Sequence, residues 1–147
     1  MEIQSIRLPV TGLQELLAEA RGEGYDFIDT LIDEWQSGAN RFEGYGETLY
    51  GGLNEERVLI AVGGLTIDPF VPYEGRAEVG RIRRVYVRAA WRNQRVGRRL
   101  VLALVEEARK SFAAVRLRAE NADAARLYER IGFSPLDDPD ATHILHF

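Results

Sequence analysis

The chain contains no cysteine, one lysine (Lys110) and two histidines, His143 and His146. Without cysteine it has no disulfides, no thiolate metal ligands and no cysteine nucleophile. Two histidines near one end give little support to a zinc site or to a Ser-His-Asp triad, so we expect no bound metal. The lack of cysteine also fits a reducing compartment, and we expect a cytoplasmic protein.

Long hydrophobic runs are also missing. No stretch of about 18 apolar residues occurs, so we expect no transmembrane helix and no membrane association. The first residues do not show a basic segment followed by an apolar one, so we expect no secretory signal. Hydrophobic residues make up 46% and charged residues 29% of the 147 positions, as in a globular protein with a sizeable core. We expect a single domain over residues 1–147.

Positive charge is concentrated in one stretch of the chain. Between Arg81 and Arg99 there are eight arginines and no acid, although the whole chain carries a net charge of −4. Such segregation in an acidic protein favours a local anionic ligand over a generally basic surface. The eight are Arg81, Arg83, Arg84, Arg88, Arg92, Arg95, Arg98 and Arg99.

Hydrophobic periodicity predicts the element order βααβββαβαββ. We expect Thr11 and Asn121 to cap the first and last helices, and Gly38 and Gly132 to end the second and last. The expected helices are residues 12–21, 25–37, 97–111 and 122–131. The expected strands are residues 2–8, 47–53, 57–67, 77–87, 113–118, 133–136 and 142–147.

The strand at residues 77–87 alternates imperfectly. Val79 and Ile82 fall on opposite parities, and Val85 and Val87 return to the parity of Val79. A phase slip of this kind predicts a β-bulge, a feature that is frequent beside active sites. The basic loop after this strand leads into the helix at 97–111, whose N-terminus offers unpaired N–H groups to phosphate.

Two motifs together resemble a known family. Residues 85–100 read V-Y-V-R-A-A-W-R-N-Q-R-V-G-R-R-L, and residues 121–133 read N-A-D-A-A-R-L-Y-E-R-I-G-F. They resemble the GNAT superfamily of acyl-CoA-dependent N-acyltransferases, and the resemblance covers residues 78–133. It implies an α/β (α+β) domain with a mixed, mostly antiparallel sheet, helices on both faces, and a splay where the central strand meets residues 113–118. It also implies direct transfer of an acetyl group from acetyl-CoA to an amine, without a covalent enzyme intermediate.

The resemblance implies a coenzyme A site around the basic loop, whose backbone amides wrap the pyrophosphate. Asn93 and Arg95 stand where many family members have glycine. Asparagine tolerates the left-handed region well, and Arg95 either turns outward or adds charge at the phosphates. The backbone of Val85, Tyr86 and Val87 would pair with the pantetheine arm, which Asn121 would also contact. The loop residues are Arg92, Asn93, Gln94, Arg95, Val96 and Gly97, continuing into Arg98.

The resemblance also implies catalytic roles. Tyr128 matches the tyrosine that protonates the departing thiolate as a general acid. Glu78 is the candidate general base, although the position that the family usually uses lies nearer Arg81. Several other residues are open alternatives along the acceptor site, as bases or as ligands of a charged acceptor. These are the acids Asp29, Asp33, Glu34, Asp68 and Glu74, the arginines Arg81, Arg83 and Arg84, and His143.

Two other functions stay open beside an N-acetyltransferase. One is a CoA-binding regulatory module without turnover. The other is a nucleic-acid binder that uses the arginine stripe, which the acidic total charge disfavours. We expect a small-molecule or peptide amine as acceptor, no nucleic acid partner, and a monomer or homodimer.

Overall fold

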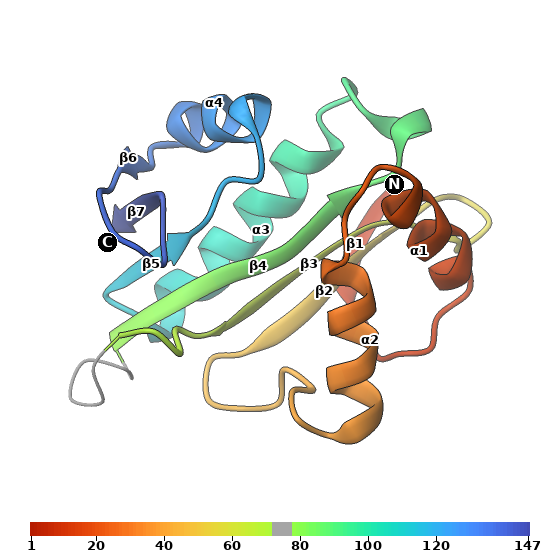
Figure 1. Ribbon diagram of the computed structural model, residues 1–147, viewed down its shortest axis with the longest axis horizontal. Helices are drawn as coiled ribbons and strands as arrows, with labels where there is room; N and C mark the ends of the chain where they lie inside the picture. The colour runs from red at the N-terminus through yellow and green to blue at the C-terminus, as the bar shows by residue number, and fades with distance from the viewer. Residues whose placement is uncertain (72–77) are drawn as a thin grey trace.

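The computed structural model describes residues 1–71 and 78–147, and within them the strands form one seven-stranded sheet (Figure 1). The strand order is β1-β2-β3-β4-β5-β7-β6, and only the β4–β5 pair is parallel. The mixed, mostly antiparallel sheet and the predicted element order are therefore confirmed. The strands are β1 (Glu2–Ser5), β2 (Thr48–Leu53), β3 (Leu59–Ile67), β4 (Val79–Val87), β5 (Ala114–Leu117), β6 (Ser134–Pro135) and β7 (His143–His146). The helices are α1 (Leu13–Gly22), α2 (Phe27–Ser37), α3 (Val96–Ser111) and α4 (Ala122–Ile131), with a short 3-10 turn η2 (Ala89–Trp91).

Helices α1 and α2 cover one face of the sheet, and α3 packs on the other (Figure 1). Leu16 of α1 and Ile28 of α2 are completely buried in the first core, whereas Leu100 and Leu104 of α3 are completely buried in the second. The amphipathic pattern of each helix thus determines which face it covers. Helix α4 joins the α3 side through Tyr128.

The start of α1 differs from the expectation. Gly12 occupies the N-cap position with φ of 95°, and the helix receives no side-chain cap from Thr11. A Cβ at position 12 would lie only 2.6 Å from a methyl of Val58, so the close packing as well as the left-handed backbone requires glycine. The predicted end of α2 is confirmed, because Gly38 adopts the left-handed conformation there.

The predicted bulge in β4 is confirmed. Arg83 lies opposite Gly64 and Tyr86 lies opposite Val62, so the register with β3 shifts between them. Two β4 residues therefore face one β3 residue, and the extra residue is accommodated by Arg84, which has φ of 60°.

The predicted splay between the parallel strands is also present. Strand β4 pairs with β5 only at residues 79–81, so residues 82–87 have no partner on that side. At about 3.3 Å per residue, this leaves roughly 16 Å of free strand edge. Helix α4 lies beyond the splay, and it begins and ends as predicted. Asn121 caps it by accepting a hydrogen bond from the Ala124 amide at 2.8 Å, and Gly132 ends it.

Candidate active site

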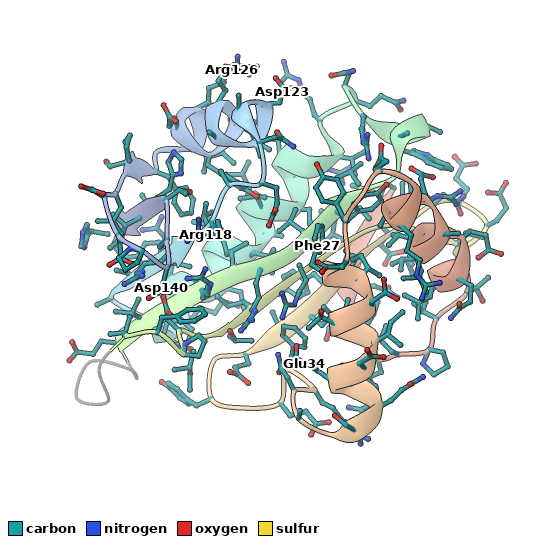
Figure 2. All side chains as sticks on the ribbon, viewed as in Figure 1. Phe27, Glu34, Arg118, Asp123, Arg126 and Asp140 are labelled. Carbon is teal, nitrogen blue, oxygen red and sulfur yellow. The ribbon has the colours of Figure 1, made fainter. Side chains whose placement is uncertain are left out.

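Two hollows lie one after the other along β4 and α4. The first, of about 190 Å³, is lined by the β4 residues before and at the bulge and by Tyr128 of α4. The second, of about 850 Å³, is lined by the last residue of β4, by the start of α3 with the loop before it, and by one side of α4 from Asp123 to Arg130. Figure 2 shows Phe27 of α2 and Arg118 beyond β5, which both line the first hollow. We call the first hollow the splay cavity and the second the α3 groove.

The start of α3 presents backbone amides that no side chain caps. Arg95 is the N-cap residue and makes no capping bond with its side chain, while the Arg99 amide bonds the Arg95 carbonyl at 3.0 Å. Among the described residues, no acceptor is within hydrogen-bond distance of the amides of Val96, Gly97 and Arg98. Unpaired amides at a helix N-terminus, together with the helix dipole, favour a phosphate there.

The two residues that replace glycine in the loop keep a glycine-like backbone. Asn93 has φ of 61° and Arg95 has φ of 65°, so both lie in the left-handed region. Both also line the α3 groove. Two residues other than glycine therefore adopt the left-handed conformation in this loop. The Arg95 side chain lies beside the α3 groove.

The one glycine of this loop has space around it. A Cβ on Gly97 would meet Val87 at 3.5 Å and Leu127 at 3.7 Å, which are ordinary contacts, and the backbone is not left-handed. Neither packing nor conformation requires glycine here. Its value lies in the close approach that it allows to the backbone at the helix start.

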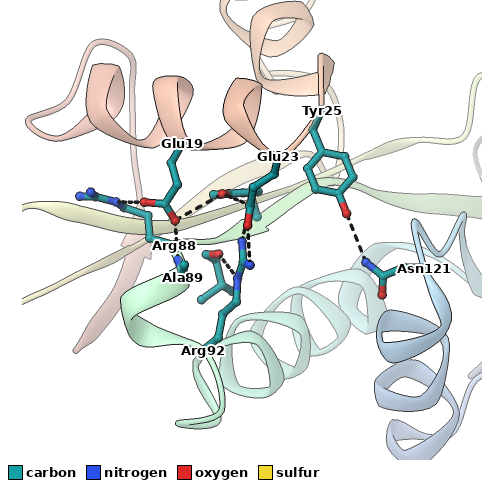
Figure 3. Close-up of polar contacts among 9 residues, drawn as sticks. Glu19, Glu23, Tyr25, Arg88, Ala89, Arg92 and Asn121 are labelled. Atoms are coloured by element: carbon teal, nitrogen blue, oxygen red, sulfur yellow. Dashed lines mark hydrogen bonds and ion pairs between the residues drawn. The ribbon is translucent and has the colours of Figure 1, made fainter.

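Many of the eight arginines between Arg81 and Arg99 form ion pairs with acidic side chains of the protein. Arg92 donates two hydrogen bonds to Glu23, at 2.6 and 2.7 Å, and a third to the Val87 carbonyl at 2.9 Å (Figure 3). Arg88 donates to Glu19 at 3.1 Å. The two acids lie one turn apart on α1, and sequence reasoning missed their role although this spacing was a visible signal.

The arginines that remain at the α3 groove are different. Arg95, Arg98 and Arg130 line it, and no described carboxylate lies within ion-pair distance of them. Arg126 also lines the groove but pairs with Asp123 on α4 (Figure 2). Arg130 was not among the predicted ligands. Gln94 does not line the groove, and its side chain donates to the Ala90 carbonyl at 3.0 Å.

The α1 acids also hold Tyr86. Its hydroxyl bonds Glu23 and lies 3.4 Å from Glu19, and desolvation with these bonds raises the Tyr86 pKa. The hydrogen bonds from Arg92 and Tyr86 lower the Glu23 pKa to about 2. Tyr86 thus fixes α1 to β4 with its side chain, whereas Val85 lines the splay cavity and Val87 the α3 groove.

The Asn121 side chain connects the start of α4 with the segment between α1 and α2. Besides capping α4, its side-chain amide donates to the Tyr25 hydroxyl at 3.3 Å (Figure 3). Tyr25 belongs to the segment between α1 and α2, so this bond bridges the splay. Both the oxygen and the nitrogen of the Asn121 side-chain amide therefore form hydrogen bonds.

Tyr128 is buried at the splay cavity, with 6% of its surface exposed. Its ring packs edge-on against Phe133 at 5.8 Å between centroids. The hydroxyl makes no hydrogen bond with the residues that the structure describes. Desolvation and the nearby Glu120 charge raise the Tyr128 pKa to about 12, so the hydroxyl keeps its proton at neutral pH.

The candidate base Glu78 lies elsewhere. It is exposed just before β4, its carbonyl accepts from the Ala113 amide at 2.8 Å, and it lines neither hollow. The structure does not bring it to Tyr128. Glu120, which sequence reasoning overlooked, lines the splay cavity with Tyr128. Glu120 directly precedes Asn121, the cap of α4, and this place in the sequence was the signal that could have identified it as a site residue.

The alternative acids are mostly paired. Asp68 is completely buried, 3.7 Å from Arg81 and 3.2 Å from Arg116, and Glu34 pairs with Arg84 at 3.1 Å. Asp29 pairs with Arg21, Asp33 is exposed, and Glu74 lies outside the described residues. His143 is buried and bonds Glu129 at 3.0 Å. Of the acids that the structure describes, Asp29, Asp33, Glu34 and Asp68 do not line the splay cavity.

Solved structures support the same fold over nearly the whole chain. A protein from Exiguobacterium sp. 255-15, provisionally assigned as an acetyltransferase, is 26% identical with a TM-score of 0.84, covering 99% of this chain and 94% of that one. A ribosomal-protein-alanine N-acetyltransferase from Brucella melitensis is 20% identical with a TM-score of 0.68, covering 99% and 96%. A glucosamine-6-phosphate N-acetyltransferase from Arabidopsis thaliana is 19% identical with a TM-score of 0.66, covering 97% and 98%.

A search of curated proteins gave no match. The family model described as "Acetyltransferase (GNAT) family" matches residues 11–133, which include both motifs and the residues that line the α3 groove and the splay cavity. Because the match spans well over half of the chain, the protein is a member of the GNAT acetyltransferase family.

Proposed function

We propose that the protein is an N-acetyltransferase that moves the acetyl group of acetyl-CoA to a primary amine of a small molecule or peptide within a ternary complex. The succession of the two hollows along β4 and α4 carries this proposal. The α3 groove offers free amides and arginines to the coenzyme phosphates, and the free β4 edge offers an extended arm its hydrogen bonds. The splay cavity then receives the thioester beside Tyr128.

The groups that line the splay cavity determine the chemistry that we propose. The neutral amine attacks the thioester carbonyl carbon, the carbon–sulfur bond breaks, and the sulfur leaves as a thiolate. Tyr128 supplies the hydrogen bond and proton for the sulfur, because its raised pKa keeps it protonated. We propose that a backbone amide at the β4 bulge stabilises the oxyanion that forms on the carbonyl oxygen.

Glu120 is our proposal for the group that accepts the amine proton. It is the one carboxylate among the described residues that line the splay cavity, and it lies close enough to Tyr128 to raise the tyrosine pKa. A carboxylate at this place also attracts a cationic amine before that amine loses its proton.

The test is release of free CoA thiol from acetyl-CoA over a panel of amines, with mass spectrometry of the acetylated product. Turnover of at least one amine is expected. Tight CoA binding without turnover of any amine would instead indicate the CoA-binding regulatory module. DNA or RNA binding that persists at physiological salt and is not displaced by CoA would indicate the nucleic-acid binder.

A further inference from the structure

The splay cavity is lined by an unusual set of charges. Four arginines reach it, and Glu120 is the one acid among the described residues of its lining. The arginines are Arg81, Arg83, Arg84 and Arg118. A cavity of about 190 Å³ is below the roughly 300–1,000 Å³ of drug-sized pockets, so it fits one small group rather than a long chain.

The bulge explains how two consecutive residues, Arg83 and Arg84, place their side chains on the same face of the sheet. Arg83 lies opposite Gly64, and a Cβ on Gly64 would meet the ring of Phe42 in the core on the α1–α2 side. Arg84, the residue with the left-handed backbone, bonds Glu34 of α2 and so lies on that same side. In a regular strand these neighbours would point to opposite faces.

Three of the four arginines have partners in the protein. Arg84 pairs with Glu34 at 3.1 Å, and Arg81 lies 3.7 Å from Asp68 and donates to the Asp140 carbonyl at 2.6 Å. Arg118 donates to the Pro139 carbonyl.

Arg83 is the exception. Among the described residues no acceptor is bonded to it and no carboxylate lies within 4.0 Å, and its Nε atom is buried without a partner. Burial, followed by the neighbouring Arg84 charge, lowers the Arg83 pKa. A guanidinium nevertheless stays charged in proteins, so a half-buried cation lies here without a paired carboxylate among the described residues.

Such a charge is costly unless an anion pairs with it. The coenzyme phosphates do not reach it in our proposed arrangement, because their groove lies at the opposite end of the free β4 edge. The second substrate is therefore the ligand that can bring an anion to Arg83.

We propose that the acceptor amine carries a compact anionic group, a carboxylate or a phosphate, that binds Arg83 in the splay cavity. This rests on the proposed acetyl transfer. The anion pairs with Arg83, and Arg118 lies in the same lining to support it. The amine of the same molecule is attracted to Glu120, the opposite charge of the cavity.

The experiment compares matched amines that differ only in the anion. Glycine is paired with glycinamide, and ethanolamine phosphate with ethanolamine, so that the two pairs separate carboxylate from phosphate. The anionic member of at least one pair should show about 10- to 100-fold higher kcat/KM, the range that one charge-assisted hydrogen bond supports. Equal or better use of both neutral members by the natural protein would overturn the proposal.

Arg83→Gln provides the second arm. This substitution should abolish the preference for the anionic amine by raising the KM for that amine, while the KM for acetyl-CoA stays unchanged. Arg109→Gln, an exposed arginine near the end of α3, is the matched control and should keep the preference. An unchanged preference in folded Arg83→Gln would contradict the proposal.

A binding arm keeps this inference separate from the proposed function. If no amine is acetylated, the proposed function fails. Calorimetry with the same four compounds in the presence of CoA then decides whether the splay cavity binds an anion. Binding of an anionic compound that Arg83→Gln removes would support the anion site by itself. Absence of such binding would overturn it.

Discussion

Arg92 and Glu23 form a two-pronged ion pair that joins the basic loop before α3 to the end of α1 (Figure 3). The same carboxylate bonds Tyr86 of β4, and Arg92 also holds the Val87 carbonyl. One carboxylate at the end of α1 therefore joins β4 and the loop that follows it, both of which lie more than 60 residues further along the chain. The loop depends on α1 for its position although α1 does not line the α3 groove.

This pair predicts an acid-sensitive contribution to stability. The Glu23 pKa falls from 4.5 to about 2 on folding, so its stabilisation is complete above pH 4.5 and is lost as the pH falls toward 2. Glu23→Gln should therefore destabilise the protein at neutral pH, and its difference from the natural protein should shrink across that window. Urea unfolding at several pH values measures this, with the exposed Glu43→Gln as control. A difference that is independent of pH would contradict the assignment.

Gly97→Ala separates folding from coenzyme binding. The nearest atoms to an added Cβ lie at 3.5 Å, so the fold tolerates it, and replacing a helical glycine adds up to about 1 kcal/mol of stability. The methyl would, however, occupy space at the backbone where the phosphate approaches. We expect at least about tenfold weaker CoA binding by calorimetry with an unchanged or higher melting temperature.

Gly22→Ala is the matched control for that variant. Gly22 is also helical, has no positive φ, and nothing lies within 4 Å of an added Cβ. It should leave CoA affinity unchanged. Equal CoA affinity in both variants would show that Gly97 is not at a ligand surface.

Tyr128→Phe tests the proton donor. The hydroxyl has no hydrogen-bond partner among the described residues, so its removal should cost little stability. The turnover number should fall by about 10²- to 10⁴-fold, as for loss of a general acid, while CoA affinity stays the same. Tyr45→Phe, at an exposed tyrosine, is the control. Retention of full turnover would exclude Tyr128 as the donor.

Local signals predicted most of the fold. Asn121 and Gly132 bound α4 at the predicted residues because a side-chain cap and a glycine stop are properties of a few neighbouring positions. The bulge was predictable from the parity slip in β4, but its location at Arg84 required the register with β3.

The partners of individual charged groups were not predictable in this way. Arg92 was expected to contact phosphate, and its pairing with Glu23 depends on how α1 packs against the loop. Glu78 was chosen from its place on the strand, whereas the side of the splay that Glu120 occupies depends on where β5 leaves β4. Local spacing can mark such acids as candidates, but it does not show which cation or cavity each of them meets.

The two candidate bases can be compared directly. Glu120→Gln should lower kcat/KM for the amine and shift its pH dependence toward higher pH, because the amine must then lose its proton to solvent. Glu78→Gln should change neither quantity, since Glu78 is exposed and lines neither hollow. Both changes remove one carboxylate and keep the side-chain size, so each variant is the control for the other. Loss of activity in Glu78→Gln alone would contradict the proposed role of Glu120 and would identify Glu78 as the base.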